Sequence, residues 1–292
     1  MSILLTGAAG YIGSAVLERL VAAGHEVTAL VRSPEKAAIV EAAGATALVG
    51  EATDVDLIRA AALAADGVIH TASSPDVDAA LVPVVVDALS SRGGRFVHTG
   101  GIWIYGSGAD LDEDSPFQPL PISGWRAEGQ ARVLAAPGGV VIAPAVVYGR
   151  GVGMIRGLID APRGSGVAPV VPLIGDGSQH WTTVHVDDLA DLYVRAYENP
   201  DARGVYIGAS GFNPTVRELG EAIASAWNVA GGVAPESADA SRERLGAAFA
   251  DAVLLDQQAA GTRARLELGW APSAPSVIDD IAAGSYSPVA VA

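Results

Sequence analysis

The sequence predicts an α/β protein: a doubly wound parallel sheet with helices on both faces, followed by a small C-terminal lobe. Short apolar strands alternate with helical segments through the first 149 residues, and the strands are continuously apolar, as in a sheet buried on both faces. Glycine and proline become dense from Gly149 to Gly177, which marks a change of organisation. We therefore expect a core at residues 1–149 and, at residues 150–292, a mixed region that completes the sheet and forms the lobe.

The expected elements of the core follow one another as strand, helix and strand. Strands are predicted at Ile3–Thr6, Glu26–Val31, Ala45–Val49, Gly67–Thr71, Arg95–Thr99 and Gly139–Ala143. Helices are predicted at Gly13–Ala23, Pro34–Ala43, Asp56–Ala64, Ala79–Ser91 and Gly124–Leu134. Beyond residue 150 we expect a strand end and helix at Val184–Glu198, a strand at Gly204–Ile207 and a helix at Thr215–Trp227.

Composition narrows the classes of partner and chemistry. The 292 residues are 50% hydrophobic and carry a formal net charge of -15, which argues against nucleic acid or an anionic membrane as a partner. The absence of cysteine excludes disulfides and thiolate metal sites, and no His/Asp/Glu spacing indicates a metal site. The first residues run straight into a glycine turn without a basic leader, so we expect a cytoplasmic location.

The most specific motif is the turn Thr6–Gly13, which reads Thr-Gly-Ala-Ala-Gly-Tyr-Ile-Gly between a strand and a helix. Gly7 permits the tight turn, Gly10 lets the backbone approach a pyrophosphate, and Gly13 permits close packing of helix on strand. The N–H groups of the helix N-terminus, at Tyr11 and Ile12, then face the phosphates. The motif predicts a Rossmann-type dinucleotide site, with Thr6 and the turn as cofactor-binding residues.

The residues after the second strand favour NADP(H) over NAD(H). Val31 stands where an acid usually binds the ribose 2′-hydroxyl of NAD, and Arg32 and Ser33 follow it. A guanidinium beside a hydroxyl suits a 2′-phosphate, and Lys36 could assist; the alternative is that Arg32 is only a solvated loop residue. The positions of other strand ends add further cofactor contacts: Glu51 and Ala52 near the adenine, Thr71, Ala72 and Ser73 near the phosphates and ribose, and Thr99, Gly100 and Gly101 near the nicotinamide.

Four segments resemble the extended short-chain dehydrogenases of the NAD-dependent epimerase/dehydratase class. They are Thr6–Gly13 (TGxxGxxG), Val68–Ala72 (VIHTA), Thr183–Ala190 (TVHVDDLA) and Leu268–Trp270 (LGW) with Pro272. The resemblance spans almost the whole chain. It implies that the C-terminal region is a substrate lobe, that His185 is structural, and that the protein is a homodimer through Ala79–Ser91 and Gly124–Leu134.

The catalytic positions depart from that class. The family's Ser or Thr corresponds to Gly101, its tyrosine to Trp125 and the lysine of its Tyr-x-x-x-Lys pair to Gly129. No realignment restores the lysine, because Lys36 is the only lysine in the chain. The chain therefore resembles the atypical subgroups that keep the cofactor site without the standard triad.

Another residue must then assist the reaction. Tyr105 is the leading candidate for a proton donor, because a tyrosine without a neighbouring lysine stays protonated near pH 7. The alternative is that Tyr105 only lines a pocket. Thr99 could orient the substrate and Arg126 could act as an electrostatic clamp, with Tyr148 and Glu128 as further candidates.

The substrate side also differs from nucleotide-sugar members of the class. Trp181-Thr182-Thr183 replaces their usual Arg-Asp-Tyr, and Ala143–Val146 lacks their Arg and Asn. An apolar pocket is expected instead, lined by Trp103, Trp125, Tyr148, Met154, His180 and Trp181. The alternative for each of these aromatic residues is ordinary core packing. His70 and His98 are expected to be packed in buried strands, and Asp187 and Asp188 to cap a helix.

These observations favour an NADP-dependent reductase of a small, mainly apolar carbonyl, imine or activated alkene. A non-catalytic NADP-binding sensor or scaffold fits the missing triad equally well. A retained epimerase or dehydratase is disfavoured, because those reactions need a base to abstract a proton or hydride. The expected partner is a small-molecule substrate.

Overall fold

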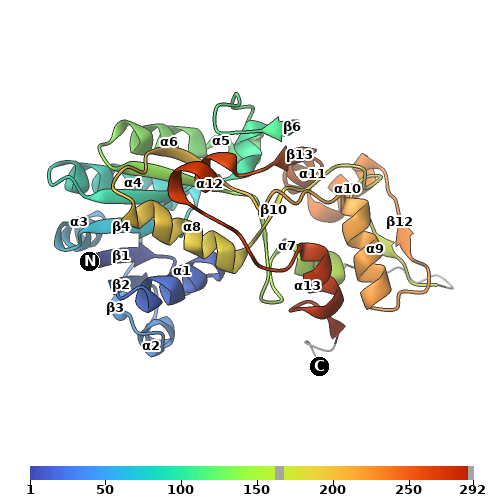
Figure 1. The fold of residues 1–292 in the computed structure, drawn as a ribbon, viewed down its shortest axis with the longest axis horizontal. Coiled ribbons are helices and arrows are strands. Elements are labelled where there is room, and N and C mark those ends of the chain that lie inside the picture. The colour runs from blue at the N-terminus through green and yellow to red at the C-terminus, as the bar shows by residue number, and fades with distance from the viewer. Residues whose placement is uncertain (162–167, 289–292) are drawn as a thin grey trace.

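A seven-stranded parallel sheet forms the centre of the computed structural model, which describes residues 1–161 and 168–288 (Figure 1). The strand order is β11-β7-β5-β4-β1-β2-β3, and every neighbouring pair is parallel. The strands are β1 (Ser2–Thr6), β2 (Glu26–Val31), β3 (Thr46–Val49), β4 (Gly67–His70), β5 (Arg95–Thr99), β7 (Gly139–Pro144) and β11 (Gly204–Gly208). The strand order reverses between β1 and β4, where doubly wound sheets bind their ligands. The predicted doubly wound sheet is confirmed.

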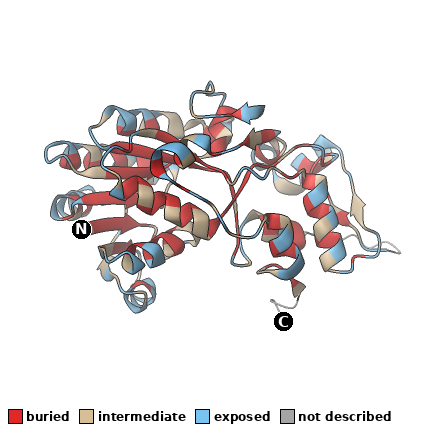
Figure 2. Ribbon diagram, viewed as in Figure 1, coloured by how far each residue is buried: buried red, intermediate tan, exposed pale blue. Residues whose placement is uncertain are grey.

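Helices cover both faces of this sheet, and the strands between them are buried (Figure 2). The helices α1 (Tyr11–Ala22) and α8 (Val186–Glu198) pack together on one face. On the other face α4 (Pro75–Ser90) packs between α3 (Val55–Ala64) and α6 (Arg126–Ala135). The helix α2 (Pro34–Ala42) contacts the edge strand β3 and its neighbour β2. A single apolar core joins the strands to these helices.

The C-terminal region adds β11 to the sheet and builds a second hydrophobic cluster at the right of Figure 1. This cluster includes Leu219, Ile223, Val277 and Ile281. Its elements are α7 (Met154–Ile159), β9 (Val171–Pro172), α9 (Val216–Ala226), β12 (Val233–Ala234), α10 (Ala238–Leu245), α11 (Ala247–Val253) and α13 (Val277–Ala283). Short elements join the two parts: η1 (Ile102–Tyr105), β6 (Gly108–Leu111), α5 (Pro121–Gly124), β8 (Val146–Tyr148), β10 (Thr183–His185), β13 (Gln257–Ala259) and α12 (Thr262–Leu268).

Helix starts differ from the prediction where capping decides them. The helix α4 begins at Pro75 rather than Ala79, because the Ser74 hydroxyl accepts a hydrogen bond from the Val77 N–H. The expectation that Asp187 and Asp188 cap α8 is wrong. The cap is His185, whose Nδ1 accepts the Asp187 N–H at 3.2 Å, in line with a structural role for this histidine.

The two aspartates instead make contacts across the chain. Asp187 pairs with Arg150, and the Asp188 carboxylate accepts the N–H groups of Ser273 and Ala274. These bonds fix the segment before α13 against α8.

Among the described residues, no helix has both the length and the apolar character that a bilayer crossing requires.

Candidate functional site

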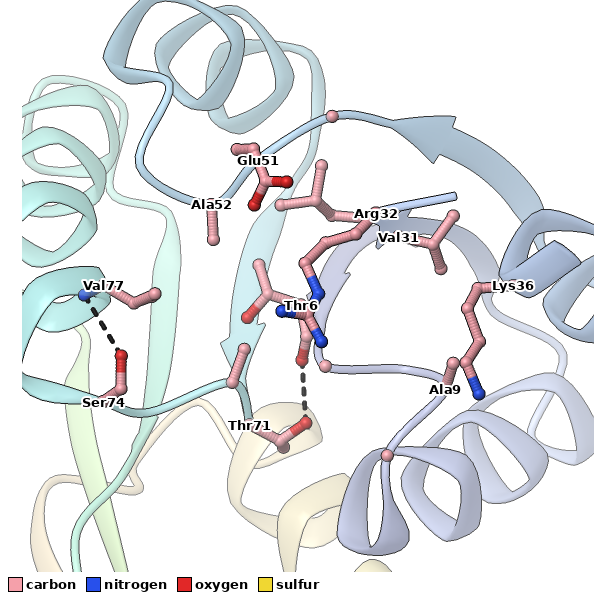
Figure 3. Close-up of a pocket in the computed structure, with 15 residues that line it drawn as sticks. Thr6, Ala9, Val31, Arg32, Lys36, Glu51, Ala52, Thr71, Ser74 and Val77 are labelled. Carbon is pink, nitrogen blue, oxygen red and sulfur yellow. Dashed lines mark hydrogen bonds between the residues drawn. The ribbon is translucent and has the colours of Figure 1, made fainter. Parts of the chain in front are cut away.

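A groove of about 490 Å³ runs along the carboxyl ends of β1, β2, β3 and β4 (Figure 3). Eight of the expected cofactor-binding residues line it: Thr6, Gly7, Gly10, Arg32, Glu51, Ala52, Thr71 and Ala72. Sequence reasoning missed Ala9, Leu30, Val31, Gly50, Ser74 and Val77, and assigned Lys36 only a supporting part. Most of these are strand-end neighbours of predicted residues, so a wider window around each strand end would have included them.

The glycine turn leaves no room for side chains beneath the groove. Gly7 has a φ of +77°, and a Cβ there would lie 2.7 Å from Thr71 Oγ1. A Cβ on Gly13 would lie 2.0 Å from the Gly7 carbonyl oxygen, so this glycine acts by packing, as predicted. Gly10 stands at the N-cap of α1 without a side-chain cap, which leaves the first N–H groups of the helix free for an anion. The turn therefore fits a pyrophosphate.

Two cationic side chains line the groove next to the carboxyl end of β2. Arg32 and Lys36 are both exposed and line the groove, and neither has an ion-pair partner in the described part of the chain. Figure 3 shows Lys36 across the pocket from Ser74 and Val77, and the Arg32 side chain extending into the middle of the view near Thr6. Glu51 also lines the groove, and no other carboxylate of the described residues does so.

Two predicted cofactor contacts are corrected. Ser33 is not part of the groove lining, because its hydroxyl caps α2 by accepting the Lys36 N–H at 3.4 Å. The same hydroxyl lowers the pKa of the exposed Glu35 carboxyl. Ser73 turns away from the groove, and its Oγ lies 3.0 Å from both carboxylate oxygens of Asp78.

A second cavity, of about 300 Å³, lies on the other side of the glycine turn. Its lining combines Tyr11 and Ile12 of α1 with Thr99–Trp103, Ser123, Arg126, Pro144–Val147, Gly153 and Met154. Trp103 and Met154 are thus where the pocket prediction placed them, and Thr99 and Gly100 are on the expected side. Sequence reasoning missed Ile102, Ser123 and Gly153, together with the use of Pro144–Val147 as a wall.

Among the described residues that line this second cavity, Arg126 is the only charged one. Its Nη1 donates to the Thr99 carbonyl oxygen at 3.1 Å, and its guanidinium lies 4.3 Å from the centre of the Trp125 ring. A Cβ on Gly101 would lie 3.9 Å from Arg126 Nε and would meet no other heavy atom of the described residues within 4 Å. Burial lowers the pKa of this guanidinium, which nevertheless keeps its charge because arginine does not deprotonate in proteins.

The positions of the missing triad do not supply an acid–base pair. Gly101 borders the second cavity, but Trp125 and Gly129 line a separate cleft of about 210 Å³ between α4 and α6. Glu128 lines the same outer cleft. Trp125 and Glu128 are therefore not part of the lining of the second cavity. Trp125, the N-cap of α6, and Glu128 in its first turn both face the outer cleft instead.

The proposal of Tyr105 as the proton donor is not supported. Its side chain is 1% exposed, lies edge-on to Phe117 with ring centres 5.3 Å apart, and lines neither cavity. Its hydroxyl has no hydrogen-bond partner among residues 1–161 and 168–288, and burial raises its pKa. The 3-10 helix η1 turns this residue into the core, which a linear reading could not show.

Thr99 has a different role from the one predicted. Its hydroxyl lies 2.6 Å from the His70 carbonyl oxygen and 2.7 Å from the Tyr193 hydroxyl, so it is committed to the protein. Its carbonyl oxygen holds Arg126. Thr99 is therefore a positioning residue for the cation rather than a free hydroxyl for the substrate.

Three other predicted pocket residues belong elsewhere. Tyr148 and Trp181 pack in the second hydrophobic cluster, where they donate to the carbonyl oxygens of Pro275 and Val253. His180 pairs with Asp256 at 2.9 Å on the surface side of this region. The pocket assignments for these three residues are corrected, and core packing explains both aromatic residues.

A buried polar cluster lies behind the carboxyl ends of β4 and β5. His70 Nε2 lies 3.0 Å from Asp78 Oδ1, and His98 Nε2 lies 3.5 Å from Asp78 Oδ2. The histidines are buried in their strands as expected, but Asp78 was not foreseen because it belongs to α4. Burial lowers the pKa of His98 to about 3, so this ring is neutral near pH 7. These three residues are also of the kinds that ligate metals, although the sequence predicted no metal site.

Comparisons with known proteins agree with this geometry. The profile of the NAD dependent epimerase/dehydratase family matches residues 3–208. An uncharacterized protein of Schizosaccharomyces pombe is 30% identical over 98% of this chain and all of its own length. A 3-diazoavenalumate denitrifying reductase of a Streptomyces species is 27% identical over 96% of this chain and 99% of its own. The crystal structure of human epimerase family protein SDR39U1 with NADPH has a TM-score of 0.75 at 24% identity, covering 97% of this chain and 99% of that one.

The fold and the glycine groove define a Rossmann-type protein of the extended short-chain dehydrogenase superfamily. Within it, the chain belongs to the NAD dependent epimerase/dehydratase family, whose model covers most of its length. The predicted resemblance to that class is confirmed, together with its atypical catalytic positions. Binding of NAD or NADP is a property of this family.

Proposed function

We propose that this protein is an NADP(H)-dependent reductase of a small, mainly apolar carbonyl, imine or activated alkene. The observation that carries the proposal is the juxtaposition of two cavities. A dinucleotide groove with two cations, Arg32 and Lys36, lies beside a mainly apolar cavity, and the described residues of that cavity's lining include one cation and no carboxylate. A cofactor would then deliver hydride into a site that holds an uncharged reacting group.

The preference for NADP(H) rests on Arg32 and Lys36. Both line the groove at the end of β2, where a ribose 2′-phosphate is recognised in this fold. Val31 occupies the position of the acid that selects NAD, and its side chain is buried. The human relative was crystallised with NADPH, which is consistent with this preference.

A bound NADPH would supply the hydride, and the chain supplies binding, exclusion of water and charge. The glycine turn and the N-terminus of α1 would hold the pyrophosphate. Ile12 and the Pro144–Val147 wall keep one side of the second cavity apolar. Arg126 would stabilise negative charge as it develops on the acceptor.

The second cavity offers no free base to an epimerase or dehydratase. Its hydroxyl groups are already engaged: Tyr11 donates to the Gly149 carbonyl oxygen, Ser123 to that of Leu120, and Thr99 to that of His70. Burial also raises the pKa of Tyr11, which keeps it protonated. Since a reductase needs only a hydride and a proton from water, this lining favours reduction. The name of the Streptomyces relative, a reductase, supports the same choice.

A non-catalytic NADP-binding sensor or scaffold is the second candidate, and the loss of the family's Ser or Thr, tyrosine and lysine favours it. The test is consumption of NADPH, followed at 340 nm, against a panel of ketones, imines and enones. Turnover of any member supports the reductase. Tight NADPH binding without any turnover supports the sensor.

The cytoplasmic location and the homodimer through α4 and α6 stay predictions. Light scattering during size-exclusion chromatography would measure the oligomeric state. A monomer under all conditions would contradict the expected dimer.

A further inference from the structure

Arg126 is a partly buried cation that has no ion-pair partner among the described residues. In the part of the chain that the structure describes, its guanidinium makes one hydrogen bond, to Thr99, and no ion pair. A guanidinium has five N–H donors, so most of them have no protein acceptor. Partial burial removes some of the water that would solvate this charge, and an opposite charge on a ligand would replace that water.

The neighbouring groups of the protein cannot provide that charge. Asp78 attracts the charge of Arg126, but its carboxylate is already hydrogen-bonded to the Ser73 hydroxyl and the His70 ring, and the His98 ring lies 3.5 Å away. Tyr193 is fully buried and its pKa is raised, so its hydroxyl stays neutral. No other described residue of the cavity lining is charged.

The cofactor does not provide it either. The groove has separate cationic or helix N-terminal sites for the phosphates, at Arg32 and Lys36 and at the glycine turn. The nicotinamide ring in NADP⁺ is itself a cation, so it adds to the positive charge. The missing negative charge must therefore come from the second ligand of the site.

The free side of Arg126 faces the substrate side. Its Nε lies beside Gly101, where the family's Ser or Thr would project, and the absence of that side chain leaves the space open. The remainder of the lining is mainly apolar, with Ile102, Trp103, Val147 and Met154. The hydroxyl groups of Tyr11, Thr99 and Ser123 also border it, but each is bound to a carbonyl oxygen of the protein. One anionic group on an otherwise apolar molecule matches this arrangement.

We propose that the substrate is an apolar compound that carries a carboxylate, and that Arg126 binds this carboxylate through its free N–H groups. The inference rests on the proposed reductase function and names its substrate class. A carboxylate accepts two hydrogen bonds from a guanidinium, which both anchors the molecule and fixes its orientation. Arg126 is then a specificity-determining residue.

Binding of acid and amide pairs to the NADP⁺ complex tests this without turnover. The probes are benzoate, cinnamate and benzoylformate, each against its neutral amide of the same size, measured by isothermal titration calorimetry. The wild-type protein should bind at least one acid roughly 10- to 100-fold more tightly than its amide, the range of a charge-assisted hydrogen bond. Arg126→Gln should remove this preference, and Arg126→Lys should keep part of it because it retains the charge.

Arg132→Gln is the matched control, because Arg132 is exposed on the same helix and lines only the outer cleft. It should leave the acid preference unchanged. NADP⁺ affinity measured without a second ligand checks that Arg126→Gln is folded, and it also tests the main alternative. If that affinity falls about tenfold or more, Arg126 binds the cofactor and the inference is overturned.

The remaining outcomes separate this inference from the proposed function. No preference for the acid in any of the three pairs, including no binding at all, overturns the inference. An Arg126-dependent preference together with an absence of NADPH consumption would uphold the anion site and refute the reductase. NADPH consumption with neutral acceptors alone, unaffected by Arg126→Gln, would uphold the reductase and refute the carboxylate.

Discussion

Replacing Arg32 with alanine is expected to weaken NADPH binding roughly 10- to 30-fold and NADH binding less than about twofold. A hydrogen bond to a charged group contributes about 1.5–3 kcal/mol, and the exposure of Arg32 places its contribution at the lower end of that range. Lys36 remains in the groove of this variant and retains part of the attraction for a 2′-phosphate. The double variant with Lys36→Ala should therefore lose more affinity than Arg32→Ala alone.

The assay is the dissociation constant of each reduced nucleotide, followed by its fluorescence on binding. Arg59→Ala is the control, because Arg59 is an exposed cation on α3 outside the groove lining. It carries the same change in net charge and should leave both constants unchanged. Equal losses for NADPH and NADH in Arg32→Ala would refute recognition of the 2′-phosphate by this residue. A loss of NADPH affinity in Arg59→Ala as large as in Arg32→Ala would show a general charge effect instead.

Three other changes test the fold and the corrected assignments. Gly13→Ala should lower the thermal unfolding midpoint and abolish nucleotide binding, because the new Cβ would lie 2.0 Å from the Gly7 carbonyl oxygen. The control Gly157→Ala should do neither, because a Cβ there meets no heavy atom of the described residues within 4 Å. Tyr105→Phe should leave any measured turnover unchanged. It should keep the free energy of unfolding or raise it by up to about 1 kcal/mol, since it removes a buried hydroxyl that has no partner among the described residues. A tenfold loss of turnover would restore Tyr105 as the acid. Burial lowers the pKa of His98 from 6.5 to about 3 in the folded state, so the unfolded chain takes up a proton at a higher pH than the folded one. The contribution of the neutral ring to stability is therefore complete above about pH 6.5 and is lost progressively as the pH falls toward 3. His98→Gln should therefore reduce the slope of the unfolding free energy against pH, measured with denaturant between pH 6.5 and 4, by at most about 1.4 kcal/mol per pH unit. An unchanged slope would contradict a neutral buried ring.

The sheet and the cofactor groove could be predicted because local signals determine them. The glycines at 7, 10 and 13 fit only a strand–turn–helix, and each strand end then falls at the same edge of a parallel sheet. Arg32 was found because its place after β2 is fixed by this topology. Ser33 was assigned wrongly because a serine there can bind a phosphate or cap the next helix, and the local sequence does not distinguish these roles.

The second cavity could be predicted only in part, because it depends on side-chain directions in irregular segments. Tyr105 and Trp125 are close in sequence to residues of its lining, but η1 turns Tyr105 into the core, and Trp125, at the N-cap of α6, lines the outer cleft. Tyr148 and Trp181 belong to the second hydrophobic cluster, whose packing involves residues far away in the chain. The Asp78 contacts with His70 and His98 join a helix to two strands, which sequence spacing does not reveal.

The central claim is tested most directly by measuring consumption of NADPH and NADH by the purified protein. The acceptors are a panel of apolar carbonyl compounds, imines and enones, some of which carry a carboxylate. We predict that at least one acceptor is reduced, with NADPH preferred over NADH, and that Arg32→Ala diminishes the preference. Saturable NADPH binding with no oxidation by any acceptor would contradict the reductase and leave a nucleotide-binding sensor or scaffold.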